Sequence, residues 1–260
     1  MDVVLALGGG GIKGVAQIPV LEALDDLGLR PTAIAGTSIG ALVGAAYAAG
    51  FTGAELRDHV HRIAAGRAAA IWATIRDPRS RILGGGLSAE AVYDLGTPDG
   101  MPEMFEALEI PFTAVTTNYY GHHCVPVRSG PLRPAVAASF AIPGLFAPIE
   151  HEGQTLVDGG LVRNLPMQEL PPGFTVAVDA LDYPAEGMAA GRIRTAVGAL
   201  QIMIKAATER ELAARPPDLL LKPRTAGAGP MEFRRISDIL EANEGLREEL
   251  KRAIAARLEA

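Results

Sequence analysis

The chain has 260 residues, 48% of them hydrophobic, and a formal net charge of −6 at pH 7. This length and apolar content suit a single large domain with a sizeable buried core. Acidic and basic residues are mixed along the chain, so no basic region typical of nucleic-acid binding stands out, and we expect no nucleic-acid partner. The one cysteine, Cys124, excludes an internal disulfide and fits a reducing compartment.

The N-terminal residues do not resemble a secretory signal, because an acidic residue, Asp2, precedes the first apolar run without a basic region. No side chain between Arg30 and Glu55 is charged, a length that could cross a bilayer. Glycines interrupt this stretch, and alanine rather than leucine predominates, so its insertion free energy would be weak. We therefore expect a cytoplasmic protein; peripheral contact with a membrane surface and homo-oligomer formation stay open.

The first element is predicted to be a buried parallel strand, because Val3–Leu7 is apolar throughout. A glycine-rich loop follows it, and apolar residues then recur at helical spacing until Gly28. Pro19 should either kink this helix or mark the point where it becomes regular.

The glycine loop has two interpretations. Gly9, Gly11 and Gly14 match the G-x-G-x-x-G pattern of dinucleotide-binding proteins. That pattern requires an acidic residue at the end of the second strand, but the strand predicted at residues 32–35 ends in Gly-Thr-Ser. An oxyanion hole suits the loop better, because consecutive glycines let several backbone N–H groups point at one spot.

The organising feature is a strand-turn-helix at Gly36-Thr37-Ser38-Ile39-Gly40. Gly36 and Gly40 lack Cβ atoms, which lets the chain pass through a tight turn with Ser38 at its apex. Two parallel strands joined by one helix bring their following loops to the same edge of the sheet, so Ser38 and the glycine loop are predicted to face one cleft. Lys13 could hold the loop or attract an anionic head group, or be a solvated surface lysine.

Residues 51–100 have a looser pattern and form a variable insert. Helices are predicted at residues 55–66 and 67–76, the second containing Trp72, and Ser88 is predicted to cap a further helix. A lid or an acyl-chain pocket could be built here, although ordinary packing is the safer interpretation.

The following part returns to strands, at residues 112–117 and 124–127. Between them lie His122 and His123, which we interpret as hairpin surface because successive strand residues point to opposite faces and no third metal ligand is nearby. An alanine-rich helix is predicted at residues 134–141.

Two aspartates end later strands. Asp158 follows a short apolar strand and precedes Gly159 and Gly160, whereas Asp179 ends the next strand and is a rival candidate. The C-terminal part, from about residue 190 to 260, is predicted to contain a helix at residues 192–214, a strand at 219–222 and a charged helix after Ser237.

The order of residues argues against the α/β-hydrolase triad, which requires serine, then acid, then histidine. No histidine follows Asp158, because the five histidines are His59, His61, His122, His123 and His151. A triad in another order stays open, but none of these histidines lies at a recognisable strand end or glycine-rich loop.

Three ordered motifs resemble those of the patatin-like phospholipase family: residues 9–14, residues 36–40 and Asp158-Gly159-Gly160. Residues 138–146 and Asn164-Leu165-Pro166 are also similar to bacterial members. The resemblance implies a Ser-Asp dyad, with Ser38 as nucleophile and Asp158 as general base. It also implies an oxyanion hole formed by Gly9, Gly10 and Gly11, with supporting roles for the motif glycines Gly14, Gly36, Gly40, Gly159 and Gly160.

We therefore expect one three-layer α/β/α domain over residues 1–260, with a mostly parallel central sheet and the patatin-like fold. The implied activity is hydrolysis of fatty-acyl esters by a carboxylic ester hydrolase of the phospholipase A or lysophospholipase type, without metal or cofactor. Two alternatives stay open: a carboxylesterase or acyl-thioesterase with the same dyad, and a non-catalytic lipid-binding protein. The intact motifs argue against the second.

Overall fold

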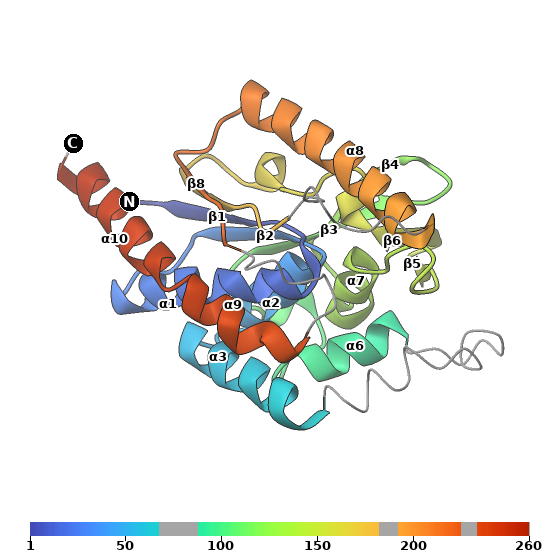
Figure 1. Cartoon of the computed structure of the whole chain (residues 1–260), viewed down its shortest axis with the longest axis horizontal. Coiled ribbons are helices and arrows are strands. Elements are labelled where there is room, and N and C mark those ends of the chain that lie inside the picture. The colour runs from blue at the N-terminus through green and yellow to red at the C-terminus, as the bar shows by residue number, and fades with distance from the viewer. Residues whose placement is uncertain (68–87, 182–191, 225–232, 260) are drawn as a thin grey trace.

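The computed structural model describes residues 1–67, 88–181, 192–224 and 233–259, which form a mixed eight-stranded sheet with helices on both faces (Figure 1). Five strands run parallel: β1 (Val3–Leu7), β2 (Ala33–Thr37), β3 (Phe112–Asn118), β7 (Phe174–Val178) and β8 (Leu219–Leu221). Three antiparallel strands extend the sheet on the β3 side: β4 (His123–Val127), β5 (Ile149–His151) and β6 (Gln154–Asp158). The predicted mostly parallel α/β/α architecture is confirmed.

The strand order is β5-β6-β3-β2-β1-β7-β8, with β4 paired to the other side of β3. Side chains of β1 alternate between two hydrophobic clusters, because successive strand residues point to opposite faces. Val3, Leu5 and Leu7 belong to the larger cluster, and Val4 and Ala6 to the smaller one.

The larger cluster is covered by most of the helices (Figure 1). They are η1 (Gly11–Gln17), α1 (Ile18–Asp26), α2 (Ile39–Ala48), α3 (Gly53–Arg62), α6 (Ala89–Gly96), α7 (Leu132–Ser139), α9 (Ile236–Ala242) and α10 (Gly245–Glu259). The smaller cluster lies under α8 (Arg192–Ala214) and the chain after β6, which contributes Leu165, Met167 and Leu170. Short helical turns complete the described chain: η2 (Ile63–Arg67), η3 (Phe105–Ala107), η4 (Gly159–Leu161), η5 (Met167–Glu169) and η6 (Phe233–Arg235).

Several predicted boundaries move. The helix after the glycine loop begins as the 3₁₀ turn η1, and the α-helix starts at Ile18 with Pro19 in its first turn, where a missing N–H is harmless. Pro19 therefore marks where the helix becomes regular. Strand β2 continues to Thr37 because Gly36 still pairs with Leu7, and Thr37 with Val115.

The insert is only partly described. Thr52 and Glu55 form a capping box at the start of α3, which passes into a π turn at Ile63–Arg67. Ser88 caps α6 as predicted, accepting a hydrogen bond from the N–H of Ala91 at 3.1 Å. The helix predicted at residues 67–76, with Trp72, lies almost wholly outside the described residues. The prediction of a lid or an acyl-chain pocket in that part of the insert lies outside them too.

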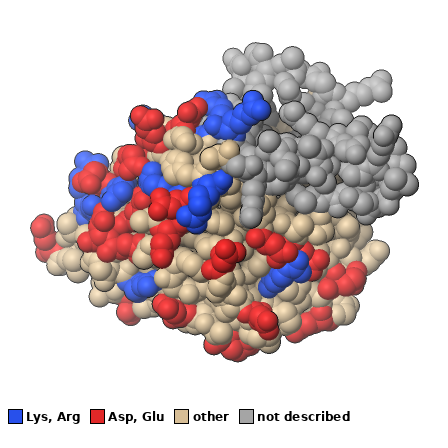
Figure 2. Space-filling model, turned by 90° about the horizontal axis from the view of Figure 1, so that it is seen from below, with Lys and Arg blue, Asp and Glu red and all other residues tan. Residues whose placement is uncertain are grey.

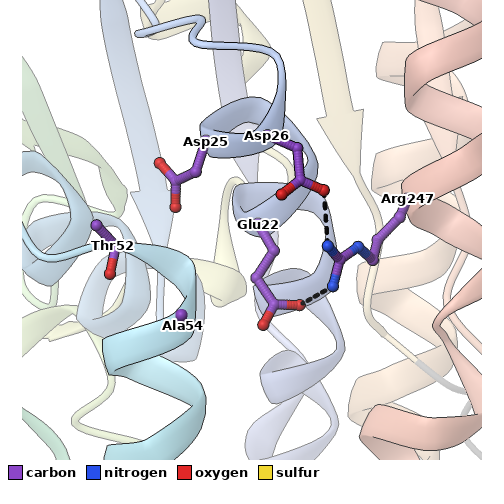
Figure 3. Close-up of a pocket in the computed structure, with 6 residues that line it drawn as sticks. All are labelled: Glu22, Asp25, Asp26, Thr52, Ala54 and Arg247. Carbon is purple, nitrogen blue, oxygen red and sulfur yellow. Dashed lines mark hydrogen bonds and ion pairs between the residues drawn. The ribbon is translucent and has the colours of Figure 1, made fainter.

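The C-terminal helix α10 is held to α1 by a network of ion pairs. Arg247 reaches Glu22 at 3.2 Å and Asp26 at 2.6 Å (Figure 3). Arg57 of α3 also contacts Glu22, at 2.5 Å. The pocket in this figure is lined by these acidic side chains together with Asp25, Thr52 and Ala54. Acidic and basic side chains are interleaved across the described part of the face in Figure 2. We interpret the ion pairs of Arg247, Glu22, Asp26 and Arg57 as an attachment between helices α10, α1 and α3.

Candidate active site

Strand β3 brings Ser38 and Asp158 together. Strand β4 pairs with one side of β3 over Ala114–Asn118, so β2 and β6 share the other side. Strand β2 runs parallel to β3 and ends with Thr37 opposite Val115, whereas β6 runs antiparallel and ends with Asp158 opposite Thr116. The two strands therefore meet end to end, and the residue after β2, Ser38, lies beside the last residue of β6.

The turn at Ser38 has the strained geometry expected of a nucleophile elbow. Ser38 has a φ of 56° and a ψ of −125°, a conformation that is unfavourable for a residue with a side chain. Helix α2 starts directly after it and passes close to β1: a Cβ on Gly40 would lie 2.2 Å from the carbonyl oxygen of Leu7. Gly36 is equally confined, since its Cβ would lie 2.4 Å from the carbonyl oxygen of Gly40. The predicted strand-turn-helix is confirmed.

The Ser38 hydroxyl donates a hydrogen bond to Asp158 Oδ2 at 2.9 Å. Both residues are buried, with exposed fractions of 6% and 7%. The other carboxylate oxygen, Oδ1, accepts the N–H of Gly160 at 2.6 Å. Burial raises the pKa of Asp158 to about 6, although these two hydrogen bonds oppose the rise. At neutral pH, Asp158 is therefore mainly a carboxylate, and a stronger base than an ordinary aspartate.

The backbone of Asp158 is also fixed. Its N–H donates to the carbonyl of Ala141 at 3.1 Å, and its carbonyl accepts the hydroxyl of Thr117 at 3.0 Å. Gly159 then passes so near β3 that a Cβ would lie 2.1 Å from the carbonyl oxygen of Val115. The Asp-Gly-Gly motif thus turns tightly across β3 and aims the carboxylate at Ser38.

The glycine loop lies beside Ser38, as predicted. A Cβ on Gly9 would lie 3.1 Å from the Cβ of Ser38, and one on Gly14 would lie 2.2 Å from the Ile39 side chain. The N–H of Gly9 donates to the carbonyl of Asn164 at 3.2 Å. This N–H already has a partner, which argues against the oxyanion-donor role predicted for Gly9; Gly10 and Gly11 stay the candidates.

The remaining candidate residues lie elsewhere. Asp179 directs Oδ1 to the N–H of Leu181 at 3.3 Å rather than to Ser38. Lys13 is only 6% exposed, so it is not a solvated surface lysine. The histidine pair lies in the predicted hairpin, where His122 and His123 are both exposed.

The other histidines take part in different contacts. His59 contacts the carbonyl of Leu95, His61 contacts the Ser237 hydroxyl, and His151 lies opposite Gln154 in the β5–β6 pair. Within the described residues, no group of three or more His, Cys, Asp and Glu side chains could hold a metal ion. No helix in this part of the chain is long and apolar enough to cross a membrane.

Two residues at the site had no predicted role. Ser139 accepts the N–H of Ser38 at 2.9 Å, and Asn164 contacts the glycine loop. Both lie in stretches that resemble the family, at residues 138–146 and 164–166, and the resemblance was the only signal that could have pointed to them.

The family model described as patatin-like phospholipase matches residues 5–171, and the chain belongs to this family. An uncharacterized NTE family protein of Mycobacterium tuberculosis is 39% identical over 173 residues, which cover 64% of this chain and 44% of that protein. A protein of Mycosarcoma maydis named Lysophospholipase NTE1 is 34% identical over 168 residues, covering 64% of this chain and 9% of that protein. The chain thus aligns with less than half the length of these relatives.

Among solved structures, VipD from Legionella pneumophila is similar in fold. The similarity covers 96% of this chain and 66% of VipD, with a TM-score of 0.50 and 15% sequence identity. At this identity the comparison concerns the fold alone.

Proposed function

We propose that this protein is a serine lipid acyl hydrolase of the phospholipase A or lysophospholipase type, with Ser38 as nucleophile and Asp158 as general base. The observation that carries the proposal is the 2.9 Å hydrogen bond between the Ser38 hydroxyl and the buried Asp158 carboxylate. Membership of the patatin-like phospholipase family and the name of the Mycosarcoma relative support a lipid ester as the substrate.

The reaction proceeds in two halves. As Ser38 Oγ attacks the ester carbonyl carbon, its proton moves to Asp158 Oδ2, because a carboxylate is too weak a base to ionise the hydroxyl beforehand. The protonated Asp158 then gives this proton to the departing alcohol, which leaves an acyl group on Ser38. A water molecule attacks the acyl carbon, and Asp158 takes its proton. Asp158 returns that proton to Ser38 Oγ as the fatty acid departs.

Burial of the carboxylate aids this chemistry. The pKa of Asp158 is raised to about 6 by removal from water, which brings the base closer to the working pH. The tetrahedral intermediate of each half-reaction carries a negative oxygen. We assign its stabilisation to backbone N–H groups of the glycine loop, where a missing donor typically lowers kcat by about 10²–10³-fold.

The test is a substrate panel of phospholipid, lysophospholipid, triglyceride, p-nitrophenyl ester and acyl-CoA, with labelling by a fluorophosphonate. We expect turnover of at least one lipid ester and labelling at Ser38, both lost in Ser38→Ala. The matched control is Ser88→Ala, which removes an exposed cap of α6 rather than a buried hydroxyl. Labelling at another residue, or wild-type turnover by Ser38→Ala, would contradict the proposal.

A further inference from the structure

Asn164 makes an unusual set of contacts with the glycine loop. It is 5% exposed and follows the Asp-Gly-Gly turn. The backbone carbonyl of Asn164 accepts the N–H of Gly9 at 3.2 Å, and the side-chain Nδ2 donates to the carbonyl of Gly9 at 3.4 Å. Both polar groups of the Gly9 backbone are therefore bound by a single residue.

The Asn164 side chain also fills the space between the two glycine motifs. A Cβ on Gly9 would lie 2.6 Å from Asn164 Oδ1, and a Cβ on Gly160 would lie 3.1 Å from the same atom. This contact explains why Gly9, which lies beside Ser38, has no side chain. The amide of Asn164 takes the volume that a Cβ at Gly9 would need.

These contacts determine the direction of a neighbouring N–H group. The peptide bond between Gly9 and Gly10 is trans, so the carbonyl of Gly9 and the N–H of Gly10 point in opposite directions. By holding that carbonyl, Asn164 turns the Gly10 N–H away from itself. Glycine has no intrinsic preference that would maintain this orientation, so an outside contact is required.

The residue before Asn164 holds the serine turn in the same way. The carbonyl of Arg163 accepts the hydroxyl of Thr37 at 3.0 Å, and Thr37 directly precedes Ser38. The two consecutive residues 163 and 164 thus bind the turn that carries the nucleophile and the loop that carries the oxyanion donors.

We propose that Asn164 is a positioning residue that aims the Gly10 N–H at the oxyanion of the tetrahedral intermediate. This inference rests on the proposed function, because it concerns a group that acts only in the transition state. Loss of the Asn164 side chain should lower kcat and leave substrate binding almost unchanged.

The experiment compares Asn164→Ala with Asn118→Ala on whichever ester the wild type hydrolyses. Asn118 is the control because its side chain makes hydrogen bonds away from the loop, to Gln154 at 2.8 Å and to the N–H of Gly121 at 2.7 Å, whereas the Asn164 side chain donates to the loop itself. We expect kcat of Asn164→Ala to fall about 10²-fold with KM within about threefold of wild type, and Asn118→Ala to keep its kcat. The acidic limb of the pH profile should stay where it is, since Asp158 is undisturbed.

A double-mutant cycle with Gly9→Ala separates this role from a general loss of packing. Gly9→Ala displaces the same amide and also places a Cβ 3.1 Å from the Cβ of Ser38, so only the part of its effect on kcat that acts through Asn164 should vanish in the Asn164→Ala background, whereas wholly independent effects would multiply. If Asn164→Ala does not fold, Asn164→Ser, which keeps a polar group and less volume, replaces it in the cycle.

Three results would overturn the inference alone: an unchanged kcat, a loss of kcat with an equal rise in KM, and multiplying effects in the cycle. A wild type that hydrolyses none of the esters and is not labelled at Ser38 would instead overturn the proposed function, and this inference with it.

Discussion

The backbone N–H of Ser38 donates to the hydroxyl oxygen of Ser139 at 2.9 Å, and this hydroxyl in turn donates to the carbonyl of Val115 at 2.6 Å. Ser139 ends α7 and is fully buried. It therefore connects the strained turn at Ser38 to the central strand β3. A strained backbone persists only when its surroundings hold it in place, and Ser139 supplies one of those contacts.

The first prediction is that Ser139→Ala lowers both stability and activity. It leaves the Ser38 N–H and the Val115 carbonyl without this buried partner, which should lower the free energy of unfolding by about 1–3 kcal/mol. The turnover rate should fall as well, because Ser38 is less firmly held. Urea unfolding and ester hydrolysis measure the two effects. Ser88→Ala is the control: it should lower stability by about 1 kcal/mol with no change in kcat.

The second prediction concerns pH. Since Asp158 must be ionised to accept the proton of Ser38, kcat/KM should rise with pH through about 6, the raised pKa of this carboxyl, and level off above it. Histidine titrates in the same range, so mutagenesis decides the assignment. Each alanine variant of His59, His61, His122, His123 and His151 should retain the acidic limb and most of the activity. Loss of activity in one of them would indicate a triad instead.

The third prediction separates function from stability at Asp158. Asp158→Asn should lower the acylation rate by about 10²–10⁴-fold, because an amide cannot accept the proton. Yet the variant should be more stable at pH 7, by up to about 3 kcal/mol, since a buried charge is removed.

The direction of this change in stability follows from the raised pKa of Asp158. The folded state binds this proton more tightly than the unfolded chain, so the stabilisation by the proton is complete below 3.8, the pKa of an ordinary aspartate, and is lost as the pH rises through about 6. Chemical unfolding at pH 7 and at pH 4 should therefore show the gain of Asp158→Asn shrinking at the lower pH. An equal gain at both values would mean that burial of charge is not its cause.

The fourth prediction tests the close approach of α2 to β1. In Gly40→Ala, the new Cβ would lie 2.2 Å from the carbonyl oxygen of Leu7, so the turn must shift. We expect a loss of about 1–3 kcal/mol in the free energy of unfolding and a large loss of activity. Gly245→Ala is the control, because its Cβ would meet no atom within 4 Å. If both variants behave alike in thermal unfolding, the packing argument is wrong.

The fifth prediction concerns the attachment of α10. Glu22→Gln should lower the free energy of unfolding by about 2–3 kcal/mol, because the Glu22 side chain is 8% exposed and pairs with both Arg57 and Arg247. Asp26→Asn also breaks a contact of Arg247, but the Asp26 side chain is 40% exposed and screened by water, so its effect should stay within about 1 kcal/mol. Urea unfolding of the two variants provides the comparison; equal losses would contradict this difference.

The sequence by itself determined the local elements of this protein. Val3–Leu7 forms β1 as predicted, and the spacing of Gly36, Ser38 and Gly40 specified a strand, turn and helix. These predictions succeeded because the physical causes are local: an apolar run favours a buried strand, and residues without Cβ permit a tight turn. Where a boundary moved, as at the end of β2, pairing with β1 and β3 extended the strand beyond its apolar residues.

The family resemblance pointed to Asp158, but only the tertiary structure decided physically which carboxylate contacts Ser38. Asp158 and Asp179 both end strands in the sequence, and residue types alone did not separate them. Asp158 lies 120 positions from Ser38, and the two meet because β2 and β6 approach the same side of β3 from opposite directions. The same assembly of strands places the Gly9 N–H where it donates to the carbonyl of Asn164, and the Ser38 N–H where it donates to the hydroxyl of Ser139. Such pairings depend on how strands are ordered in the sheet, which the pattern of any one strand does not contain.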